Sequence, residues 1–339
     1  MRGESAPHND LIDGHGRDGN VHEHFSLDPG LVRFPVWAGP QPRFESAVLD
    51  ETEEFRLVQD DWGIRKRMNK KSPSVPEPLE WAVSNREDFE RVREERFTPA
   101  LSGRAPENLP DLAREYANRD FPVTFFGCCY GIYGTLRNLM GDEKLLTSFY
   151  DEPGLVREMM AFFTDFYIQL AEEMLSFVKP DCANFWEDIA YKTAPLISPA
   201  MFSEFMRPCY RRLTGFLREH GVATVLVGCD GNLEKLIPLF LEAGVTGLYP
   251  VEVNAGNDVV AIRKSYPRLQ LMGGLSKQKA AQGKAAIDEE LDAKVPWMLS
   301  QGGYVPHIDH HVHPEVSFKD FTYYRTRLNE LIEKQGEHS

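Results

Sequence analysis

Residues 221–254, GVATVLVGCDGNLEKLIPLFLEAGVTGLYPVEVN, decide the fold class of this chain. An apolar run at 223–227 precedes a helical pattern at 233–242, and a second apolar run follows at 245–249. Gly244 stands between the helix and the second run, where glycine commonly ends a helix because it adopts the left-handed conformation. Two short buried strands joined by a helix are typical of a βαβ unit, so this stretch predicts parallel strands.

The alternation of strand and helix continues on both sides of this unit, from about residue 120 onward. We predict six strands, at 121–126, 181–186, 223–227, 245–249, 269–272 and 302–305. We predict helices at 153–178, 198–220, 233–242, 258–266, 277–301 and 317–334. Six repeats fit an α/β barrel better than a doubly wound sheet, and no glycine-rich phosphate fingerprint follows the first of these strands.

The first part of the chain follows a different pattern. Residues 1–30 are rich in Gly, His, Asp and Asn, which predicts an irregular N-terminal segment. An antiparallel meander is predicted from three short β-type runs, at 47–49, 55–58 and 64–67. Pro73, Pro76 and Pro78 then indicate a rigid linker. We therefore expect one domain over 31–339, into which the meander and linker of 45–80 are inserted.

The composition indicates a globular protein with an acidic surface. The 339 residues include 38 Lys plus Arg and 52 Asp plus Glu, which gives a formal net charge of −14. This charge argues against nucleic-acid and anionic-membrane binding, because both need a positive face. The most apolar stretch, 155–178, contains five charged residues, so no membrane span is expected. An odd count of five cysteines and the absence of a visible secretory signal predict a cytoplasmic location.

Polar side chains gather where the predicted strands end. In a parallel barrel these carboxyl ends meet at one mouth, and active sites form there. We therefore expect the following residues to converge on one site: Cys128, Tyr130, Glu187, Asp188, Tyr191, Cys229, Asp230, Glu252, Asn254, Ser276, His307 and His310. The members expected to bind substrate are Cys128, Glu252, Asn254, Ser276 and His307.

The histidine-rich tract 307–313 is the most specific local feature, with four of the ten histidines beside Asp309. His and carboxylate groups together suit Zn²⁺ or another divalent first-row ion, although a solvated polar loop is the alternative. Alternation along the strand directs His310 away from both Asp309 and His311, so we prefer His310 as a ligand. Cys229 and Asp230 follow a buried strand and would complete the site; a buried cysteine and a helix-capping turn are the alternatives.

Glu187 and Asp188 are adjacent acids after the second predicted strand. Adjacent side chains of a strand point to opposite faces, so one acid is expected to act as a metal ligand or general acid–base. The other would pair with Lys192 on the surface or start a helix. Both acids are predicted catalytic residues, and Glu187 is also a predicted ligand. Tyr130 and Tyr191 complete the catalytic set as residues that would orient a substrate.

A set of short motifs is distributed along the chain in a fixed order. They are Asp188 to Lys192, Pro195 to Pro199, Arg207-Pro208, Asp230-Gly231, Pro250 to Gly256, Gly273-Gly274, and Gly302 to Tyr304 with Asp309-His310 and Pro314. Together they resemble the uroporphyrinogen decarboxylase-like superfamily over about residues 25–334. The resemblance implies a (β/α)8 TIM-type barrel, here with an N-terminal antiparallel β meander. The first strand of the family pattern is not recognisable near the N-terminus.

The superfamily covers two chemistries. Its true decarboxylases grip the acidic groups of a tetrapyrrole with an N-terminal arginine segment, which Arg33 and Arg43 do not match here. Its corrinoid-dependent methyltransferases hold zinc with a His-x-Cys pair and a later Cys, and these positions fall at Gly228, Asp230 and His310. The resemblance therefore implies a metal site with harder donors than those of the family.

The sequence thus predicts an enzyme closer to the methyltransferase branch. We expect a divalent metal, zinc before others, held by Asp230, His310, Cys229 and Glu187. It would act as a Lewis acid on a methoxy or thiol substrate. A corrinoid on a partner protein would donate or accept the methyl group. The sequence is compatible with a homodimer. The alternatives are a carboxy-lyase of the uroporphyrinogen decarboxylase type and a degenerate, non-catalytic binding barrel.

Overall fold

The structure, a computed structural model, describes residues 24–25, 27–71 and 76–336. Its centre is a sheet of seven strands in the order β1-β6-β7-β8-β9-β10-β11, in which all neighbours run parallel. The strands are β1 (Val32–Arg33), β6 (Val123–Phe126), β7 (Cys182–Trp186), β8 (Thr224–Gly228), β9 (Gly247–Tyr249), β10 (Gln270–Met272) and β11 (Tyr304–Val305). The six predicted strands are confirmed, and a seventh lies near the N-terminus.

β1 occupies the place of the strand that the sequence patterns do not reveal. Val32 aligns with Val123 and Arg33 with Thr124, and the N–H of Phe34 donates to the Thr124 carbonyl at 2.9 Å. Two paired residues are too few to show a hydrophobic period. The antiparallel meander is therefore an insertion between the first two strands of the parallel sheet.

The parallel sheet does not form a closed ring in the part of the chain that the structure describes, because β11 and β1 are not paired there. One additional parallel bridge joins Leu275 and Ile308, beyond the ends of β10 and β11. The predicted α/β class, with a parallel sheet and a separate antiparallel sheet, is confirmed. The eight strands and the ring closure of a TIM-type barrel are not seen among the described residues.

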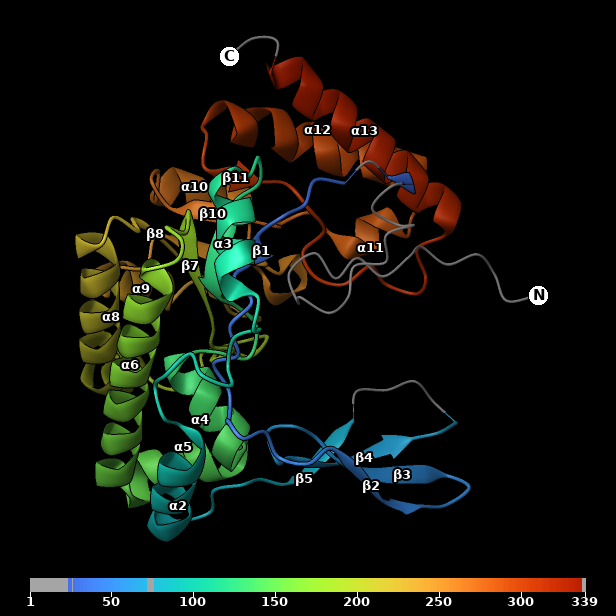
Figure 1. Ribbon diagram of the computed structural model, residues 1–339. Coiled ribbons are helices and arrows are strands. Elements are labelled where there is room, and N and C mark those ends of the chain that lie inside the picture. The colour runs from blue at the N-terminus through green and yellow to red at the C-terminus, as the bar shows by residue number, and fades with distance from the viewer. Residues whose placement is uncertain (1–23, 26, 72–75, 337–339) are drawn as a thin grey trace.

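The helices surround the sheet (Figure 1). Those from residue 153 onward follow the predicted periods, whereas four helices between residues 86 and 151 were not predicted. The helices are α2 (Arg86–Arg96), α3 (Leu109–Ala117), α4 (Ile132–Met140), α5 (Asp142–Asp151), α6 (Pro153–Leu175), α7 (Pro199–Met201), α8 (Arg207–Glu219), α9 (Ile237–Glu242), α10 (Val259–Ser265), α11 (Lys277–Ala280), α12 (Lys284–Ser300) and α13 (Phe318–Gly336). Two short irregular turns are the π-helical η1 (Phe202–Met206) and the 3₁₀-helical η2 (Val253–Ala255). The predicted helix at 277–301 is divided into α11 and α12 before Gly283, whose φ is 84°.

The predicted helix at 198–220 is confirmed, with an irregular middle. The Ser198 hydroxyl accepts a hydrogen bond from the N–H of Met201 at 3.1 Å and so caps its start. The π-turn η1 separates α7 from α8 just before Pro208. Proline has no N–H to donate one turn back, so the helix widens at this point. α8 then carries Tyr210 to the end of β7.

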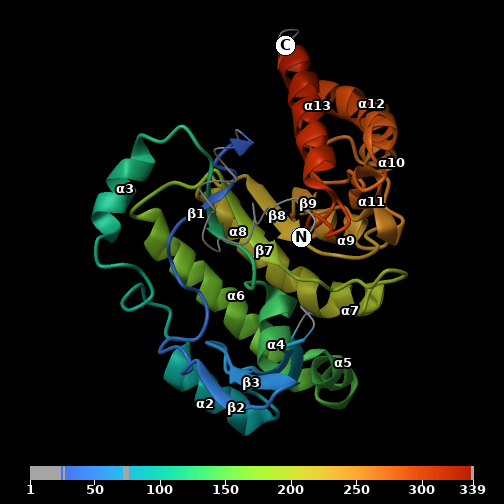
Figure 2. The same ribbon diagram turned by 90° about the vertical axis from the view of Figure 1, so that its right-hand side faces the viewer.

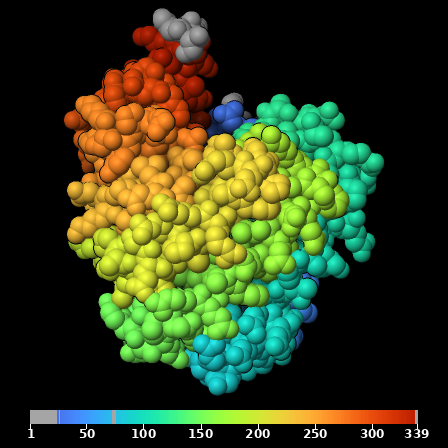
Figure 3. All heavy atoms as spheres, turned by 90° about the vertical axis from the view of Figure 1, so that its left-hand side faces the viewer, coloured from blue at the N-terminus to red at the C-terminus, as the bar shows by residue number. Residues whose placement is uncertain are grey.

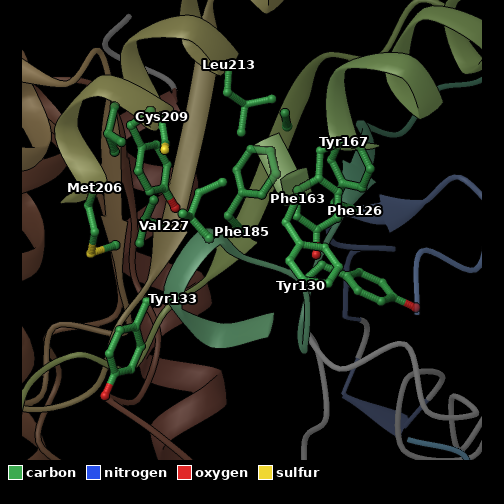
Figure 4. Packing of buried hydrophobic residues seen from close by; sticks show 14 of the residues in the cluster. Phe126, Tyr130, Tyr133, Phe163, Tyr167, Phe185, Met206, Cys209, Leu213 and Val227 are labelled. Atoms are coloured by element: carbon green, nitrogen blue, oxygen red, sulfur yellow. The ribbon is translucent and has the colours of Figure 1, made fainter. Parts of the chain in front are cut away.

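The largest apolar core lies between the sheet and helices α6 and α8. Phe126 of β6 stacks on Phe185 of β7 with ring centroids 5.2 Å apart, and Tyr167 of α6 meets Phe126 edge-on at 5.1 Å. Figure 4 shows these rings together with Cys209 and Leu213 of α8. Figure 3 shows one face of the molecule with all heavy atoms drawn, on which the yellow part of the chain, between the green and the orange parts, lies beside the orange part. Burial of each such ring stabilises the fold by roughly 1.5–3 kcal/mol, which fixes the ends of β6 and β7.

A second apolar cluster joins α12 and α13. Leu291 of α12 and Phe321 and Leu328 of α13 are buried in it. Ile308 and Val312, in the loop after β11, belong to the same cluster. This packing holds α13 beside that loop. Figures 1 and 2 show α12 and α13, in orange and red, at the end of the molecule away from the meander.

The predicted meander is confirmed as a separate antiparallel sheet. Its strands, in spatial order, are β2 (Ala47–Glu51), β3 (Phe55–Gln59), β4 (Arg65–Asn69) and β5 (Glu77–Glu80). The linker expected around the three prolines needs correction, because Pro78 lies in β5 and aligns with Lys66 of β4. β5 is an edge strand, where a residue without an N–H is tolerated.

Two further sequence predictions are the irregular N-terminal segment and the absence of a membrane span. The irregular segment predicted for 1–30 lies outside the described residues up to residue 23, and residues 72–75 near the prolines also lie outside them. In the described ranges, no helix combines the length and the apolar character that crossing a membrane requires.

Candidate functional site

A cavity of about 240 Å³ opens at the carboxyl ends of the parallel strands. Its walls come from the residues that follow β6, β7, β8 and β9, from the loop 307–312 after β11, and from α13. The charged or titratable side chains in these walls include Asp188, Asp230, His310 and Arg325. Active sites of parallel barrels form at these strand ends, so the cavity is the candidate active site.

Asp188, Asp230 and His310 meet in this cavity. His310 Nε2 lies 3.2 Å from Asp230 Oδ2, and the backbone N–H of Asp230 donates to Asp188 Oδ1 at 3.0 Å. Arg137 of α4 brings its Nη1 to 3.6 Å from Asp188 Oδ2. The three side chains follow three different strands, so the sheet gathers groups that are far apart in the sequence. The structure thus brings Asp230 and His310 together.

The neighbouring charges shift the pKa values of this group. Burial, followed by the charge of Asp230, raises the pKa of Asp188 from 3.8 to about 6, although Arg137 acts in the opposite direction. The hydrogen bond to Asp230 raises the pKa of His310 above 6.5. A carboxyl group and an imidazole whose pKa values are both raised, and which lie side by side in a cavity, are suited to moving a proton.

Strained backbone marks three of the strand ends. Phe126 at the end of β6, Asp188 after β7 and Val251 after β9 have φ angles of 63°, 45° and 57°. Non-glycine residues adopt positive φ at a cost of about 1–3 kcal/mol, and such residues collect at functional sites. The side chain of Asp188 faces the cavity, while that of Glu187 faces the start of α4.

Glu187 is fully buried beneath the N-terminus of α4 and does not line the cavity. Its Oε1 accepts the N–H of Ile132, and its Oε2 accepts those of Tyr133 and Gly134, each at 2.7 Å. The hydroxyl of Tyr210 also donates to Oε1. Burial raises the pKa of Glu187 from 4.5 to about 7, against these four donors. The oxygens predicted to bind a metal are therefore engaged by the protein itself.

Glycines at the start of α4, one just before its first residue and one in its first turn, make this arrangement possible. A Cβ on Gly131 would lie 2.1 Å from the Trp186 carbonyl oxygen, and one on Gly134 would lie 2.2 Å from it. Both distances are impossible for real atoms, so only glycine lets the start of α4 rest against the end of β7. The close approach brings the helix N–H groups to the Glu187 carboxylate, where the helix dipole favours a negative charge.

Glu252 and the buried Asp309 hold the loops beside the cavity. Glu252 accepts the N–H of Gly231 at 2.9 Å and lies 3.3 Å from Lys277 Nζ. Asp309 accepts the N–H of Val253 at 2.8 Å and that of Lys277 at 3.0 Å. Neither acid belongs to the cavity walls. Glu252, predicted to bind substrate, therefore lies behind the walls and fixes their backbone.

Cys128 and Cys229 line the cavity. Cys229 is buried, and its Sγ lies 3.4 Å from the carbonyl oxygen of Asp230. Burial, followed by the charge of Asp188, raises the pKa of the Cys229 thiol well above 9.0. Metal ligation needs a thiolate, so the surroundings of Cys229 favour a protonated thiol over a ligand.

His307 and His311 also line the cavity. His307 Nδ1 lies 2.6 Å from the Ile308 carbonyl oxygen, and burial lowers the pKa of His307. As the alternation predicted, His310 and Asp309 point in different directions. His310 lines the cavity, and Asp309 points into the loops. The alternation fails for His311, because residues 309–311 form bends rather than a strand.

Besides Glu187 and Glu252, four more predicted site residues lie outside the cavity walls: Tyr130, Tyr191, Asn254 and Ser276. Tyr130 is buried against Trp37 and Trp62, with ring centroids 6.0 and 6.3 Å apart. The hydroxyl of Ser276 caps α11, and Asn254 is half-buried in η2. Tyr191 is 70% exposed.

The predicted metal ligands form only part of a donor set. Within the described ranges, no group of three or more His, Cys, Asp or Glu side chains is arranged to hold a metal ion. Asp230 and His310 bind each other directly. A Cβ on Gly228, where the family resemblance places a further ligand, would lie 2.7 Å from the Tyr249 ring. The side chains as arranged therefore do not fit a complete metal site.

Tyr324 and Arg325 of α13 line the cavity, although no sequence motif points to them. The apolar stripe of α13 includes the buried Phe321 and Leu328. Arg325 lies four residues after the first and three before the second, so it falls on this stripe. A charged residue on the apolar side of a helix is unusual, and this was the available signal.

Comparisons with known proteins support the resemblance. Sixteen chains of known structure match this one significantly. One is a methyltransferase from Methanosarcina mazei, with a TM-score of 0.60, 14% sequence identity, and coverage of 92% of this chain and 83% of that chain. At this identity the similarity concerns the fold alone. A search of curated proteins gives no significant match.

The family comparison is more direct. The model of the uroporphyrinogen decarboxylase (URO-D) family matches residues 60–330. The matched region is most of the chain and contains β6 to β11, the cavity walls and α13 up to residue 330. The protein therefore belongs to the uroporphyrinogen decarboxylase (URO-D) family.

Proposed function

We propose that this protein is a methyltransferase that acts on a small molecule in the strand-end cavity. In this proposal His310 and Asp230 handle the proton that accompanies methyl transfer. The observation that carries the proposal is the pairing of His310 Nε2 with Asp230 Oδ2 at 3.2 Å in a cavity at the carboxyl ends of parallel strands. The fold similarity to a methyltransferase supports the reaction class.

The two directions of methyl transfer make opposite demands on a proton. A methoxy donor needs a proton on its leaving oxygen, whereas an acceptor thiol must lose one. The imidazole of His310 donates in its protonated form and accepts in its neutral form. Asp230 orients the ring and favours the protonated form, because it raises the pKa of His310. Asp188, with a pKa of about 6, adds a second titrating group.

The proposal includes a partner. A corrinoid bound to another protein would supply or accept the methyl group at the cavity mouth. The eight-stranded barrel implied by the family is likewise a proposal. Because the set of metal-binding side chains is incomplete, the proposed methyl transfer includes no step on a metal. Zinc stays a prediction from the sequence.

The two alternatives fit the cavity less well. A tetrapyrrole decarboxylase needs several cationic groups for its carboxylates, and Arg325 is the one arginine among the described residues of the cavity walls. A volume of about 240 Å³ is also smaller than the roughly 300–1,000 Å³ of sites for drug-sized ligands. A degenerate binding barrel would have an apolar mouth, whereas charged groups line this one.

Replacement of His310 tests the proposal. His310→Gln keeps the size of the side chain but cannot transfer a proton, so we expect methyl transfer to fall by about 100- to 10,000-fold. The assay is transfer from methylcobalamin to a panel of short charged and neutral thiols, with the thioether measured by mass spectrometry. His313→Gln is the matched control, because His313 lies on the same loop with a side chain 51% exposed, and it should stay within about twofold.

A wild-type rate in His310→Gln would remove the assignment. Elemental analysis of the same three proteins checks the zinc prediction. Stoichiometric metal in the wild type and in His313→Gln, but not in His310→Gln, would support a metal at this pair. Equal metal content in all three would place any bound metal elsewhere.

A further inference from the structure

Three side chains of the cavity walls carry a buried polar atom that has no hydrogen-bond partner among the described residues. They are Nε2 of His307, the hydroxyl of Tyr324 and Nε of Arg325. More than about 90% of buried polar groups in proteins are hydrogen-bonded, and an unpaired one costs roughly 1–3 kcal/mol. Three such atoms in a single cavity indicate that a ligand completes their hydrogen bonds.

Arg325 adds a charge that the described part of the chain does not balance with an ion pair. Its side-chain hydrogen bond there runs from Nη2 to Asn329 Oδ1 at 3.1 Å. Burial lowers the pKa of the guanidinium, and the charge of Asp28 offsets this only in part. A buried charge is costly unless it is paired, and an oxyanion provides both the counter-charge and hydrogen-bond acceptors.

The three atoms differ in what they ask of a ligand. Nε of Arg325 and the Tyr324 hydroxyl can both donate a hydrogen bond. Burial lowers the pKa of His307 and the charge of Arg325 acts in the same direction, which favours the neutral ring. Its Nδ1 proton faces the Ile308 carbonyl at 2.6 Å, so Nε2 is left as an acceptor. The ligand therefore needs an oxyanion and a neighbouring hydrogen-bond donor.

We propose that His307, Tyr324 and Arg325 bind the anionic head group of the substrate, an oxyanion with an adjacent O–H or N–H. This inference rests on the proposed function and names the substrate class of the same cavity. Asp188 and Asp230 would repel an anion from their part of the walls. The head group at Arg325 therefore leaves the uncharged, reacting end of the molecule for His310.

Binding of three small probes to the full chain tests this subsite by calorimetry. The probes are 2-hydroxy-3-methoxypropanoate, 3-methoxypropanoate, which lacks the hydroxyl, and 3-methoxypropanamide, which also lacks the charge. The wild type should bind 3-methoxypropanoate about 10- to 100-fold more tightly than the amide, since a charge-assisted hydrogen bond is at stake. The hydroxyl should add a further, roughly threefold to tenfold gain through His307.

Two arginines of α13 give a matched pair of variants. Arg325→Gln should lose the preference for the carboxylate over the amide, and Arg325→Lys should keep part of it. Arg327→Gln should keep all of it, because Arg327 is bound at the surface to Asp292 at 2.9 Å and Glu330 at 3.1 Å. Circular dichroism of each variant shows whether the fold is retained.

The outcomes separate this inference from the proposed reaction. A charge preference that disappears in Arg325→Gln supports the subsite even if no methyl transfer is found. Methyl transfer without any charge preference overturns the subsite and leaves the reaction standing. Equal binding of the carboxylate and the amide by the wild type, no binding of any probe at millimolar concentration, or a preference that survives in Arg325→Gln would each overturn the inference.

Discussion

Glu187 and Asp188 are consecutive acids at the end of β7, and their surroundings differ. Glu187, together with the first turn of α4 and Tyr210, forms what we call the Glu187 cap, in which four donors occupy both carboxylate oxygens. Asp188, with Asp230 and His310, forms the Asp188 cavity group, in which Asp188 accepts one backbone N–H and lies near Arg137. One acid is enclosed by the protein, and the other borders a cavity.

The comparison shows that a shifted pKa does not by itself identify a functional acid. Burial raises the pKa of Glu187 to about 7 and that of Asp188 to about 6. The difference lies in hydrogen-bonding capacity, which the protein fills at Glu187 and leaves partly open at Asp188. A carboxylate whose acceptor positions are filled supports the fold, whereas one with open positions can serve a ligand.

Removal of the Glu187 carboxylate should give the largest effect on stability. In Glu187→Ala the N–H groups of Ile132, Tyr133 and Gly134 stay buried without an acceptor. Each such group costs roughly 1–3 kcal/mol, so we expect the free energy of unfolding to fall by at least about 3 kcal/mol. Urea unfolding followed by circular dichroism measures this loss.

Tyr210→Phe is the control for the same cap, because it removes one donor and leaves the carboxylate in place. Its cost should be about 1 kcal/mol. If Glu187→Ala destabilised the protein no more than Tyr210→Phe, while methyl transfer vanished, the cap would have to be regarded as part of the active site.

The Asp188 cavity group should show the opposite response, in a defined pH window. The pKa of Asp188 is about 6 in the folded protein, against 3.8 for an ordinary aspartate side chain. The folded state therefore binds this proton more tightly, so the contribution of Asp188 to stability falls as the pH rises from about 4 to above 6. Asp188→Asn lacks this titration and should gain on the order of 1 kcal/mol relative to wild type between pH 5 and pH 8.

Asp142→Asn controls for the loss of a carboxylate near Arg137, since the Arg137 Nε lies 2.9 Å from Asp142 Oδ1 at the surface. Unfolding at pH 5 and pH 8 should show a nearly constant difference between this variant and the wild type. A constant difference for Asp188→Asn as well would mean that folding does not raise the pKa of Asp188. The contrast between Asp188 and Glu187 would then weaken.

The parallel sheet was predictable because its strands are short, apolar and separated by helical periods. The same rule misses β1, in which only Val32 and Arg33 are paired. It also misreads Pro78, because a proline in an edge strand looks like a linker until its partner strand is known. Local sequence patterns thus predict helices and strands that are long enough to show a hydrophobic period. Shorter or irregular strands are recognised only from the strands with which they pair.

The site was predictable in outline for a similar reason. Convergence of strand ends follows from topology, so Asp188, Asp230 and His310 could be grouped in advance. The enclosure of Glu187 depends on α4 approaching through Gly131 and Gly134, which no periodicity encodes. The place of Arg325 depends on the packing of α13 against the loop after β11. Roles that depend on how one element packs on another need the structure.

Tyr191 should give the smallest effect and so marks the outer limit of the Asp188 cavity group. Its side chain is 70% exposed, and its backbone is fixed independently, because its carbonyl accepts the N–H of Asn232 at 3.0 Å. Tyr191→Phe should therefore change kcat/KM for methyl transfer by less than about twofold, as should Tyr150→Phe, a control on α5 that is 74% exposed. A tenfold loss in Tyr191→Phe alone would extend the working surface beyond the cavity walls. The open hydrogen-bond acceptor positions of Asp188 would then be one part of a larger site that closes around a bound partner. Whether the protein fills the acceptor positions of a carboxylate would no longer separate structural from functional residues at this end of the sheet.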